Sequence, residues 1–454
     1  MGSWYGQACS FEGRTKVTDV RRVPIEDPMV QSVRGFPRGM QLCPTWTEDV
    51  MSNSEVTFHR RPRERGQTII LVAVAMVSLL AMAALAIDVT TLYVARGEMQ
   101  RAADAAALAG AKAFVDSGLT SDPTNTTRQA LAQSMATAVI NSIVQENKVA
   151  GAAPQLAPGS PDFAGLTTNP GNPQITVTLQ RTDLPTFFAR IWGTRLSTVT
   201  ATAVAEAYNP SNAPAGYPPI TPKCVKPLLV VNKDPNPPNT PFINPVNFVP
   251  NPGLLGETIA LKPCSIPPCN AGTFRPALVD PASTKLCPSC QGATDYENGI
   301  ECCDSTSYAC GGTTPLANVA TTLLDPQLSN ETRNGVQCLI NQPTEDTLDP
   351  TSLGNLSAGT GPARITAGSG LHSGTLVTTS RSIATVPIIE SPTANPAHVI
   401  GFLQVFIDPV TPGPPPVTVT AHILNVVGCG AAPGGGVSVS GGGYSAIPVR
   451  LIHN

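Results

Sequence analysis

The longest apolar stretch of the chain runs from Thr68 to Ile87, and its twenty residues carry no charged side chain. A helix rises 1.5 Å per residue, so this stretch spans about 30 Å, the thickness of the hydrocarbon core of a bilayer. The buried helix of a soluble domain shows a polar face with a 3.6-residue period, and this stretch shows none. The pattern predicts a transmembrane helix over residues 67–88.

The residues that flank the apolar stretch predict its orientation in the membrane and whether it is cleaved. Four arginines precede it against the single acidic Glu64, which keeps the N-terminal side cytoplasmic and exports everything after Asp88. The triplet Ala84-Leu85-Ala86 resembles a signal-peptidase site, but signal peptides have apolar regions of about 7–15 residues. A retained anchor is therefore favoured over a cleaved leader. The four arginines are Arg60, Arg61, Arg63 and Arg65.

The segment before the apolar stretch divides at Met51. Residues 51–66 have the composition of a basic cytoplasmic leader. Residues 1–50 show no hydrophobic periodicity. They are either an over-extended reading frame, with translation starting at Met51, or a disordered N-terminal extension.

Beyond the predicted membrane span the helix is expected to continue, because glycine and proline are absent from Gln67 to Arg96. Apolar residues recur every seven positions along one seam, which indicates either packing on the helix's own domain or a contact with another subunit. We favour the first. Ser117-Gly118 and Pro123 are expected to end the helix. The seam consists of Leu85, Leu92, Met99, Ala106 and Ala113.

The next segments predict a second helix and a small antiparallel sheet. Residues 127–147 carry an apolar stripe, and residues 175–180 and 197–208 alternate with the period of two that is typical of strands. Between the strands, a short helical turn is expected after Pro185, closed by Gly193. Together these elements predict a pilin-like α+β module over residues 89–208. The stripe consists of Leu131, Met135, Val139, Ile140, Ile143 and Val144.

The C-terminal half has a different composition. Thirteen prolines fall within residues 209–252, which predicts an extended linker or irregular surface layer with a possible strand at 227–231. Residues 253–454 contain most of the cysteines and four β-branched, aliphatic runs separated by Pro/Gly turns. We expect a mainly β domain with a sandwich-like sheet. The four runs are 382–390, 398–408, 417–428 and 444–452.

Ten cysteines lie in the part of the chain that is expected to be exported. An even number of cysteines in an oxidising compartment predicts disulfides, with the cluster from residue 264 to 310 as the staple of a loop-rich region. The "CPSC" spacing at 287–290 also fits a zinc knuckle, which stays as an alternative. Adjacent cysteines at 302 and 303 are expected to have different partners. The candidates are Cys224, Cys264, Cys269, Cys287, Cys290, Cys302, Cys303, Cys310, Cys338 and Cys429.

Composition argues against several function classes. Charged residues make up 13% of the chain, about half of the usual share, which suits a packed or oligomer-facing exterior. The net charge of −3 and the scattered arginines argue against nucleic acid as a partner. No G-x-S-x-G, H-E-x-x-H or Walker A motif is present, so we expect no enzyme, no cofactor, no metal and no small-molecule substrate.

The segment "RGQTIILVAVAMVSLLAMAALAIDVTTLYVARGEMQRAADAAALAGA" resembles the N-terminal module of TadE/TadG-like proteins of the tight-adherence (Flp, type IVb) pilus-assembly system. The resemblance extends over about residues 60–208 and is most specific at 84–111. It departs from prepilins at Leu71, where they carry a glutamate, and "DSTSY" at 304–308 does not complete a von Willebrand A metal motif. The motif positions are Gly66, Gln67, Asp88, Tyr93, Arg96, Gln100 and Asp104.

The resemblance implies a membrane-anchored, non-enzymatic component of a Tad-type assembly system. It would sit in the cytoplasmic (inner) membrane with a single span, an N-terminus in the cytoplasm and an extracytoplasmic C-terminal domain. Its partners would be pilins or other assembly subunits. Two alternatives stay open: a secreted or surface adhesin-like protein released after Ala86, and an envelope zinc-binding module.

Overall fold

The structure is a computed structural model that describes residues 67–168, 172–193, 196–212, 218–264, 269–288, 290, 292, 294–316, 325–430 and 445–452. The extension 1–50, the leader 51–66 and Gly66 lie outside the described residues. Helices and strands alternate without the repeating order of a doubly wound fold, and the described part has an α+β fold.

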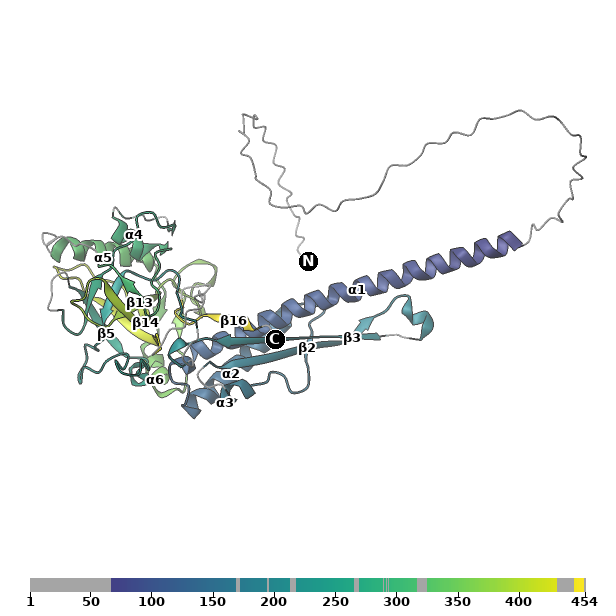
Figure 1. Cartoon of the computed structure of the whole chain (residues 1–454), viewed down its shortest axis with the longest axis horizontal. Helices are drawn as coiled ribbons and strands as arrows, with labels where there is room; N and C mark the ends of the chain where they lie inside the picture. Colours follow the sequence, from purple (N-terminus) through teal and green to yellow (C-terminus); the bar gives the residue numbers. More distant parts are fainter. Residues whose placement is uncertain are drawn as a thin grey trace, which may run out of the picture. The chain divides into compact units, whose positions relative to one another are not determined.

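Helix α1 (Gln67–Asp116) runs without a break from the apolar stretch into the core of the protein (Figure 1). The large apolar side chains between Ile69 and Ile87 are all more than half exposed. From Ala95 onward, one face of the helix is buried in the interior. Within the described residues α1 is the helix that is long and apolar enough to cross a membrane. It ends just before Gly118, whose φ of 72° only glycine adopts readily.

Helix α2 (Thr126–Glu146) packs against α1, and its buried face differs from the predicted stripe. Val139 is exposed and Leu131, Met135 and Ile143 are partly exposed. The reason is the alanine-rich face of α1, which small residues on α2 approach most closely. A Cβ on Gly110 of α1 would lie 2.8 Å from Ile140 Cδ1. The buried face consists of Arg128, Ala132, Ala136, Ile140 and Val144.

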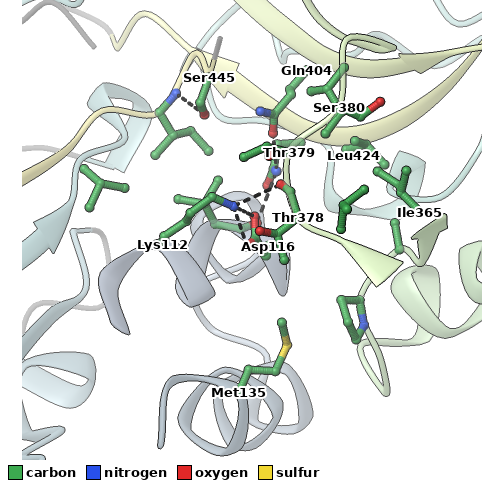
Figure 2. A pocket seen from close by; sticks show the side chains of 18 of the residues that line it. Lys112, Asp116, Met135, Ile365, Thr378, Thr379, Ser380, Gln404, Leu424 and Ser445 are labelled. Carbon is green, nitrogen blue, oxygen red and sulfur yellow. Dashed lines mark hydrogen bonds and ion pairs between the residues drawn. The ribbon is translucent and has the colours of Figure 1, made fainter. Parts of the chain in front are cut away.

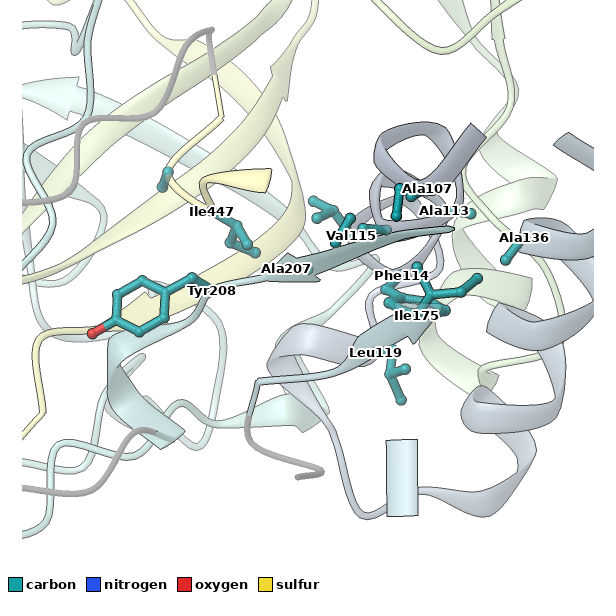
Figure 3. Packing of buried hydrophobic residues seen from close by; sticks show 14 of the residues in the cluster. Ala107, Ala113, Phe114, Val115, Leu119, Ala136, Ile175, Ala207, Tyr208 and Ile447 are labelled. Carbon is teal, nitrogen blue, oxygen red and sulfur yellow. The ribbon is translucent and has the colours of Figure 1, made fainter. Parts of the chain in front are cut away.

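The predicted small sheet is present and has four strands in the order β1-β2-β3-β16, all antiparallel. Helix α1 lies on it, and Figure 3 shows Phe114 of α1 beside Ile175 of β2 in the shared core. Strand β16 was predicted to belong to the C-terminal sheet, but it pairs with β3, and Arg450 forms an ion pair of 2.6 Å with Glu206. The strands are β1 (Gln155–Leu156), β2 (Gln174–Pro185), β3 (Leu196–Ala207) and β16 (Val449–Ile452).

The C-terminal part is mostly β, as predicted, but its main sheet closes on itself instead of forming a sandwich. Six strands follow in the order β13-β4-β6-β5-β15-β14, β13 also pairs with β14, and β9 extends the sheet beside β14. The pairs β4–β13 and β5–β6 are parallel and the others antiparallel. The strands are β4 (Leu228–Val231), β5 (Thr258–Pro263), β6 (Thr273–Pro276), β9 (Thr313–Thr314), β13 (Ile383–Ile389), β14 (Ala397–Ile407) and β15 (Val419–Gly428).

Strands β14 and β15 are buried on both faces, which explains their nearly continuous apolar sequences. Leu403 and Val426 point to the core inside the closed sheet, while neighbouring Phe402 and Val427 join the core that α1 and the four-stranded sheet share. The alternation that predicts a sheet with one wet face is therefore absent here. The C-terminal part and the α1 module are fused by a continuous core.

The proline-rich segment 209–252 was predicted to be an extended linker or irregular surface layer with a possible strand at 227–231. Its described residues do contain a strand, β4, and they contribute to this core. All four residues of β4 are buried, and so are Ile220, Phe242 and Ile243.

Short elements complete the described part. Helices α4 and α5 cover one end of the closed sheet, where Ile300, Val336 and Ile340 join its core. The remaining helices are α3 (Ala164–Thr168), α4 (Asp295–Glu301), α5 (Asp325–Leu339), α6 (Pro350–Ala358) and the 3₁₀ turns η1 (Leu119–Ser121), η2 (Ala189–Trp192), η3 (Pro210–Asn212), η4 (Pro252–Leu254) and η5 (Gly370–His372). The remaining strands are β7 (Lys285–Leu286), β8 (Cys303–Asp304), β10 (Thr347–Leu348), β11 (Ile365–Thr366) and β12 (Leu376–Val377).

Candidate functional site

Asp88 stands where the apolar stretch of α1 ends, and its carboxylate binds the tip of the β2–β3 hairpin. Its Oδ1 accepts a hydrogen bond of 2.9 Å from the backbone N–H of Phe187. Its Oδ2 accepts bonds from the N–H groups of Phe188 at 2.9 Å and Ala189 at 2.6 Å. Asp88 is 3% exposed. The three N–H groups replace the water that a buried carboxylate loses. Such hydrogen bonds lower the free-energy cost of burying a charge.

The sequence of the tip explains why its N–H groups are free to bind Asp88. Residues 189–192 form the turn η2, and the first N–H groups of such a turn have no partner within it. Pro185 ends β2 and has no N–H to satisfy. Gly193 closes the turn at φ 95°, the left-handed region that glycine supplies without strain. The short helical turn predicted between Pro185 and Gly193 is present as η2.

Gln100 and Asp104 form a second contact between α1 and the hairpin. The Gln100 amide donates to Asp104 Oδ1 at 2.8 Å and to the backbone carbonyl of Thr202 in β3 at 3.3 Å. This contact lies about three helical turns beyond Asp88, so α1 holds the hairpin at two heights.

The remaining motif positions do not meet at this site. Tyr93 is 79% exposed, and Arg96 is exposed as well. The side chain of Gln67 lies outside the described residues, as does Gly66. The structure thus brings together Asp88, Gln100 and Asp104 with backbone groups of residues 187–189 and 202. A sequence pattern could not point to these backbone partners, because they carry no distinctive side chain.

A cavity of about 560 Å³ lies between the α1 module and the C-terminal part (Figure 2). Its wall is largely apolar, with Leu108, Val377 and Leu424 among the lining residues. Lys112 and Asp116 form an ion pair of 2.6 Å at its edge, and Lys112 also donates to the Thr378 carbonyl at 3.3 Å. No histidine or cysteine is among the residues that line it.

Two histidines of the C-terminal part, His398 and His422, have structural partners. His422 Nδ1 lies 2.9 Å from Thr258 Oγ1, and its Nε2 lies 2.9 Å from Asp408. Thr258 and His422 are cross-strand neighbours of β5 and β15, which accounts for their contact. His398 lies between Glu390 and the Gly311 carbonyl, both at 3.1 Å. Neither histidine lines the cavity described above.

The ten candidate cysteines form five disulfides. The pairs are Cys224–Cys303, Cys264–Cys269, Cys287–Cys302, Cys290–Cys338 and Cys310–Cys429. The adjacent residues 302 and 303 have different partners, and the two cysteines of "CPSC" are bonded to positions 302 and 338 instead of to each other. Within the described residues no group of histidine, cysteine and acidic side chains is arranged to hold a metal ion.

Lys226 is buried beside two of these disulfides. Its ammonium donates to the Cys302 carbonyl at 2.7 Å, and it is 1% exposed. Burial lowers the pKa of Lys226 to about 7, an effect that the nearby carboxylates of Asp304 and Glu301 partly oppose. Burial also raises the pKa of Glu301. The amine therefore loses its proton far more readily in the folded protein than in an unfolded chain.

This burial predicts that stability increases with pH from about 7 to 9. Between the folded pKa of about 7 and the ordinary lysine pKa of 10.5, the unfolded chain binds a proton at Lys226 that the folded chain does not bind. The free energy of unfolding should then rise by up to about 1.4 kcal/mol per pH unit. Urea unfolding at several pH values measures this slope. Lys226→Met should remove it, and Lys262→Met, at an exposed position of β5, should leave it in place. An unchanged slope in Lys226→Met would contradict the assignment.

Residues 66–113 match the family model described as "Putative Flp pilus-assembly TadE/G-like". No curated protein and no solved structure matched the chain. The matched segment contains most of α1, including Asp88 and the alanine-rich face that packs on α2. This segment is thus similar to TadE/TadG-like proteins of Flp pilus assembly, and the resemblance identified from the sequence is confirmed for residues 66–113.

Proposed function

We propose that the protein is a membrane-anchored, non-enzymatic structural component of a Tad/Flp pilus assembly and secretion system. The observation that carries this proposal is the division of α1 into two halves. Its apolar N-terminal half exposes large side chains along its length, while its C-terminal half is the central helix of a folded module. Exposed leucine, isoleucine and valine on every side of a helix suit lipid far better than water.

The protein would cross the cytoplasmic membrane once, with its N-terminus in the cytoplasm. The four arginines before residue 66 support this orientation. The five disulfides support export of the C-terminal part, because disulfides persist in oxidising compartments and are rare in the cytosol.

The exported module would act by contact with other subunits. A long helix that lies on an antiparallel sheet is the arrangement of pilin-type modules, and it supports pilins or other assembly subunits as partners. Tyr93 and Arg96 belong to the family motif and are exposed just beyond the membrane span, so we assign them to such contacts. Nucleic acid and small-molecule substrates are not among the partners that we propose.

Two other functions are alternatives to this proposal. A secreted, adhesin-like protein would arise from cleavage after Ala86, which would separate the apolar stretch from Asp88. A zinc-binding module would need thiolates at 287 and 290, and both sulfurs are in disulfides here. The N-terminal residue of the mature protein distinguishes the anchored form from the released one.

A topology reporter tests the proposed anchor. Alkaline phosphatase fused after Asn454 should be active, and the fusion should stay in the membrane fraction, because α1 is retained and the C-terminal part is exported. Replacement of Arg60, Arg61, Arg63 and Arg65 by glutamate should lower the activity by removing the positive charge that fixes the orientation. Replacement of exposed Lys262 and Lys233 by glutamate serves as the charge control. A soluble mature protein that begins at Ile87 would contradict the anchor.

A further inference from the structure

The tip of the β2–β3 hairpin, described over residues 184–193 and at Leu196, exposes apolar side chains close in sequence to an arginine. Phe187 is 63% exposed and Leu196 is 58% exposed, and strand pairing joins Pro185 to Leu196 across the hairpin. Arg190, in the turn between them, is exposed as well. Exposed large apolar side chains gathered at one place, with a basic residue close by in the chain, are typical of a surface that contacts a membrane or another protein.

Asp88 fixes the height of this tip along α1. It directly follows the twenty-residue apolar stretch and binds the N–H groups of residues 187–189. Figure 1 shows the hairpin running beside α1, with the N-terminal half of the helix continuing beyond it. Ala84 and Ala81, one and two turns before Asp88 on the same face, are partly buried, while Ala83 and Ala86 on other faces are exposed. The covered face of α1 thus extends into the apolar stretch.

The backbone of the tip suits a medium without water. A polar backbone group in lipid must find its partner within the protein. Three consecutive N–H groups at the tip bind the Asp88 carboxylate, Pro185 has none, and the Gly193 N–H donates to the Arg190 carbonyl at 3.1 Å. In a hairpin that stayed in water, these N–H groups could form hydrogen bonds with solvent instead.

We propose that the hairpin tip is a second membrane contact, which inserts Phe187 and Leu196 at the boundary between acyl chains and headgroups of the exported leaflet. Arg190 pairs there with lipid phosphates, an arrangement typical of interfacial elements. The inference rests on the proposed membrane span of α1. Two contacts, joined by Asp88, fix the rotation of α1 about its axis and the height of the exported part above the bilayer, which a single helix leaves free.

Fluorescence quenching by brominated lipids tests this contact in the full chain, in nanodiscs of phosphatidylcholine and phosphatidylglycerol. Trp4, Trp46 and Trp192 are the three tryptophans of the chain and are replaced by phenylalanine. Single tryptophans are then introduced by Phe187→Trp and, independently, Leu196→Trp. Leu79→Trp, within the apolar stretch, reports the span. Leu371→Trp, at a fully exposed site of η5, serves as the control in the exported part.

We expect Phe187→Trp and Leu196→Trp to lose more emission with bromines near the headgroup than with bromines near the chain ends. Leu79→Trp should be quenched most by the deeper bromines, and Leu371→Trp should keep its emission. Quenched Leu79→Trp with both tip variants as bright as Leu371→Trp would overturn the inference and leave the span intact. Loss of quenching at Leu79→Trp itself would overturn the span, and the inference with it. Quenching of the tip that requires an added protein fraction would assign the tip to a protein partner and also overturn the inference.

Discussion

Removal of the disulfide between Cys310 and Cys429 should lower the free energy of unfolding of the C-terminal part by about 4–5 kcal/mol. The two cysteines are 119 residues apart, the longest separation among the five disulfides. A cross-link that closes a 100-residue loop removes about 4.7 kcal/mol of denatured-state entropy in the chain model. The bond ties the end of β15 to the loop before β9, and both sulfurs are buried. Urea unfolding of the Cys310→Ala/Cys429→Ala protein measures the loss.

The disulfide between Cys264 and Cys269 supplies the matched control. Its cysteines are five residues apart, so the same model gives a loss of only about 2 kcal/mol for Cys264→Ala/Cys269→Ala. A variant that lacks the long cross-link but unfolds at the same urea concentration as this control would contradict the chain-entropy account.

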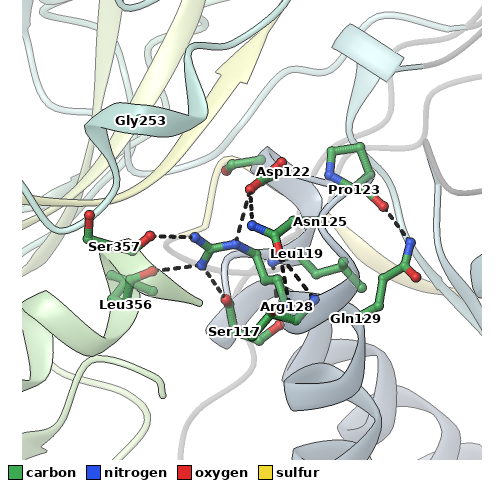
Figure 4. A network of polar contacts seen from close by, with 12 residues as sticks. Ser117, Leu119, Asp122, Pro123, Asn125, Arg128, Gln129, Gly253, Leu356 and Ser357 are labelled. Carbon is green, nitrogen blue, oxygen red and sulfur yellow. Dashed lines mark hydrogen bonds and ion pairs between the residues drawn. The ribbon is translucent and has the colours of Figure 1, made fainter. Parts of the chain in front are cut away.

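Replacement of Arg128 by methionine should cost about 3–5 kcal/mol, the range for removing one partner of a buried ionic network. Arg128 is 1% exposed and lies in the first turn of α2. Its guanidinium donates to the carbonyls of Ser117 at 3.0 Å, Leu356 at 2.8 Å and Ser357 at 3.2 Å, and lies 3.6 Å from Asp122 (Figure 4). One side chain thus joins the end of α1, the start of α2 and α6. Methionine would remove a donor from each of these carbonyls, of which that of Leu356 also accepts a bond of 3.2 Å from the Gly359 N–H.

Two variants show whether the loss comes from this network. Arg128→Lys keeps the charge but cannot reach three carbonyls with one ammonium, so it should recover little of the stability. Arg101→Met removes an exposed arginine of α1, whose bond of 3.4 Å goes to the Gly97 carbonyl of its own helix, and should have little effect. Equal urea midpoints for Arg128→Met and Arg101→Met would contradict the proposed role of Arg128.

The sequence predicted the elements whose signals are local. The absence of glycine and proline from 67 to 96 predicted the unbroken first half of α1, and period-two alternation predicted β2 and β3. The bounds of the turn η2 followed from Pro185 and Gly193. These features depend on the backbone preferences of neighbouring residues, which a single sequence displays directly.

The features that the sequence missed depend on contacts between distant segments. Val139 reads as part of an apolar stripe, but the small residues Ala132 and Ala136 face α1 because they allow the closest packing. The run around Val449 has the pattern of any strand, and nothing local in it indicates pairing with β3, more than two hundred residues away. The closed sheet likewise results from the pairing of β13 with β14 and with β4, which periodicity does not encode.

The candidate site was predictable only in part. Asp88 stood out in the family pattern as a charge at the end of an apolar stretch, but its partners lie about a hundred residues further along and are backbone groups. The number and export of the cysteines predicted disulfides, whereas ten cysteines allow many pairings and spacing does not choose among them. Arg128 carried no sequence signal, because its carbonyl partners come from segments brought together only by the fold.

The amount of Flp pilin on the cell surface tests the central claim most directly. It should be measured in host cells that lack this protein and are complemented either with the full chain or with a variant in which Leu79 and Leu80 are replaced by arginine, which prevents α1 from entering the membrane. We expect surface pilin to disappear without the protein, to return with the full chain and to stay absent with the arginine variant. Surface pilin at the same level in all three strains would contradict a role as a membrane-anchored component of pilus assembly.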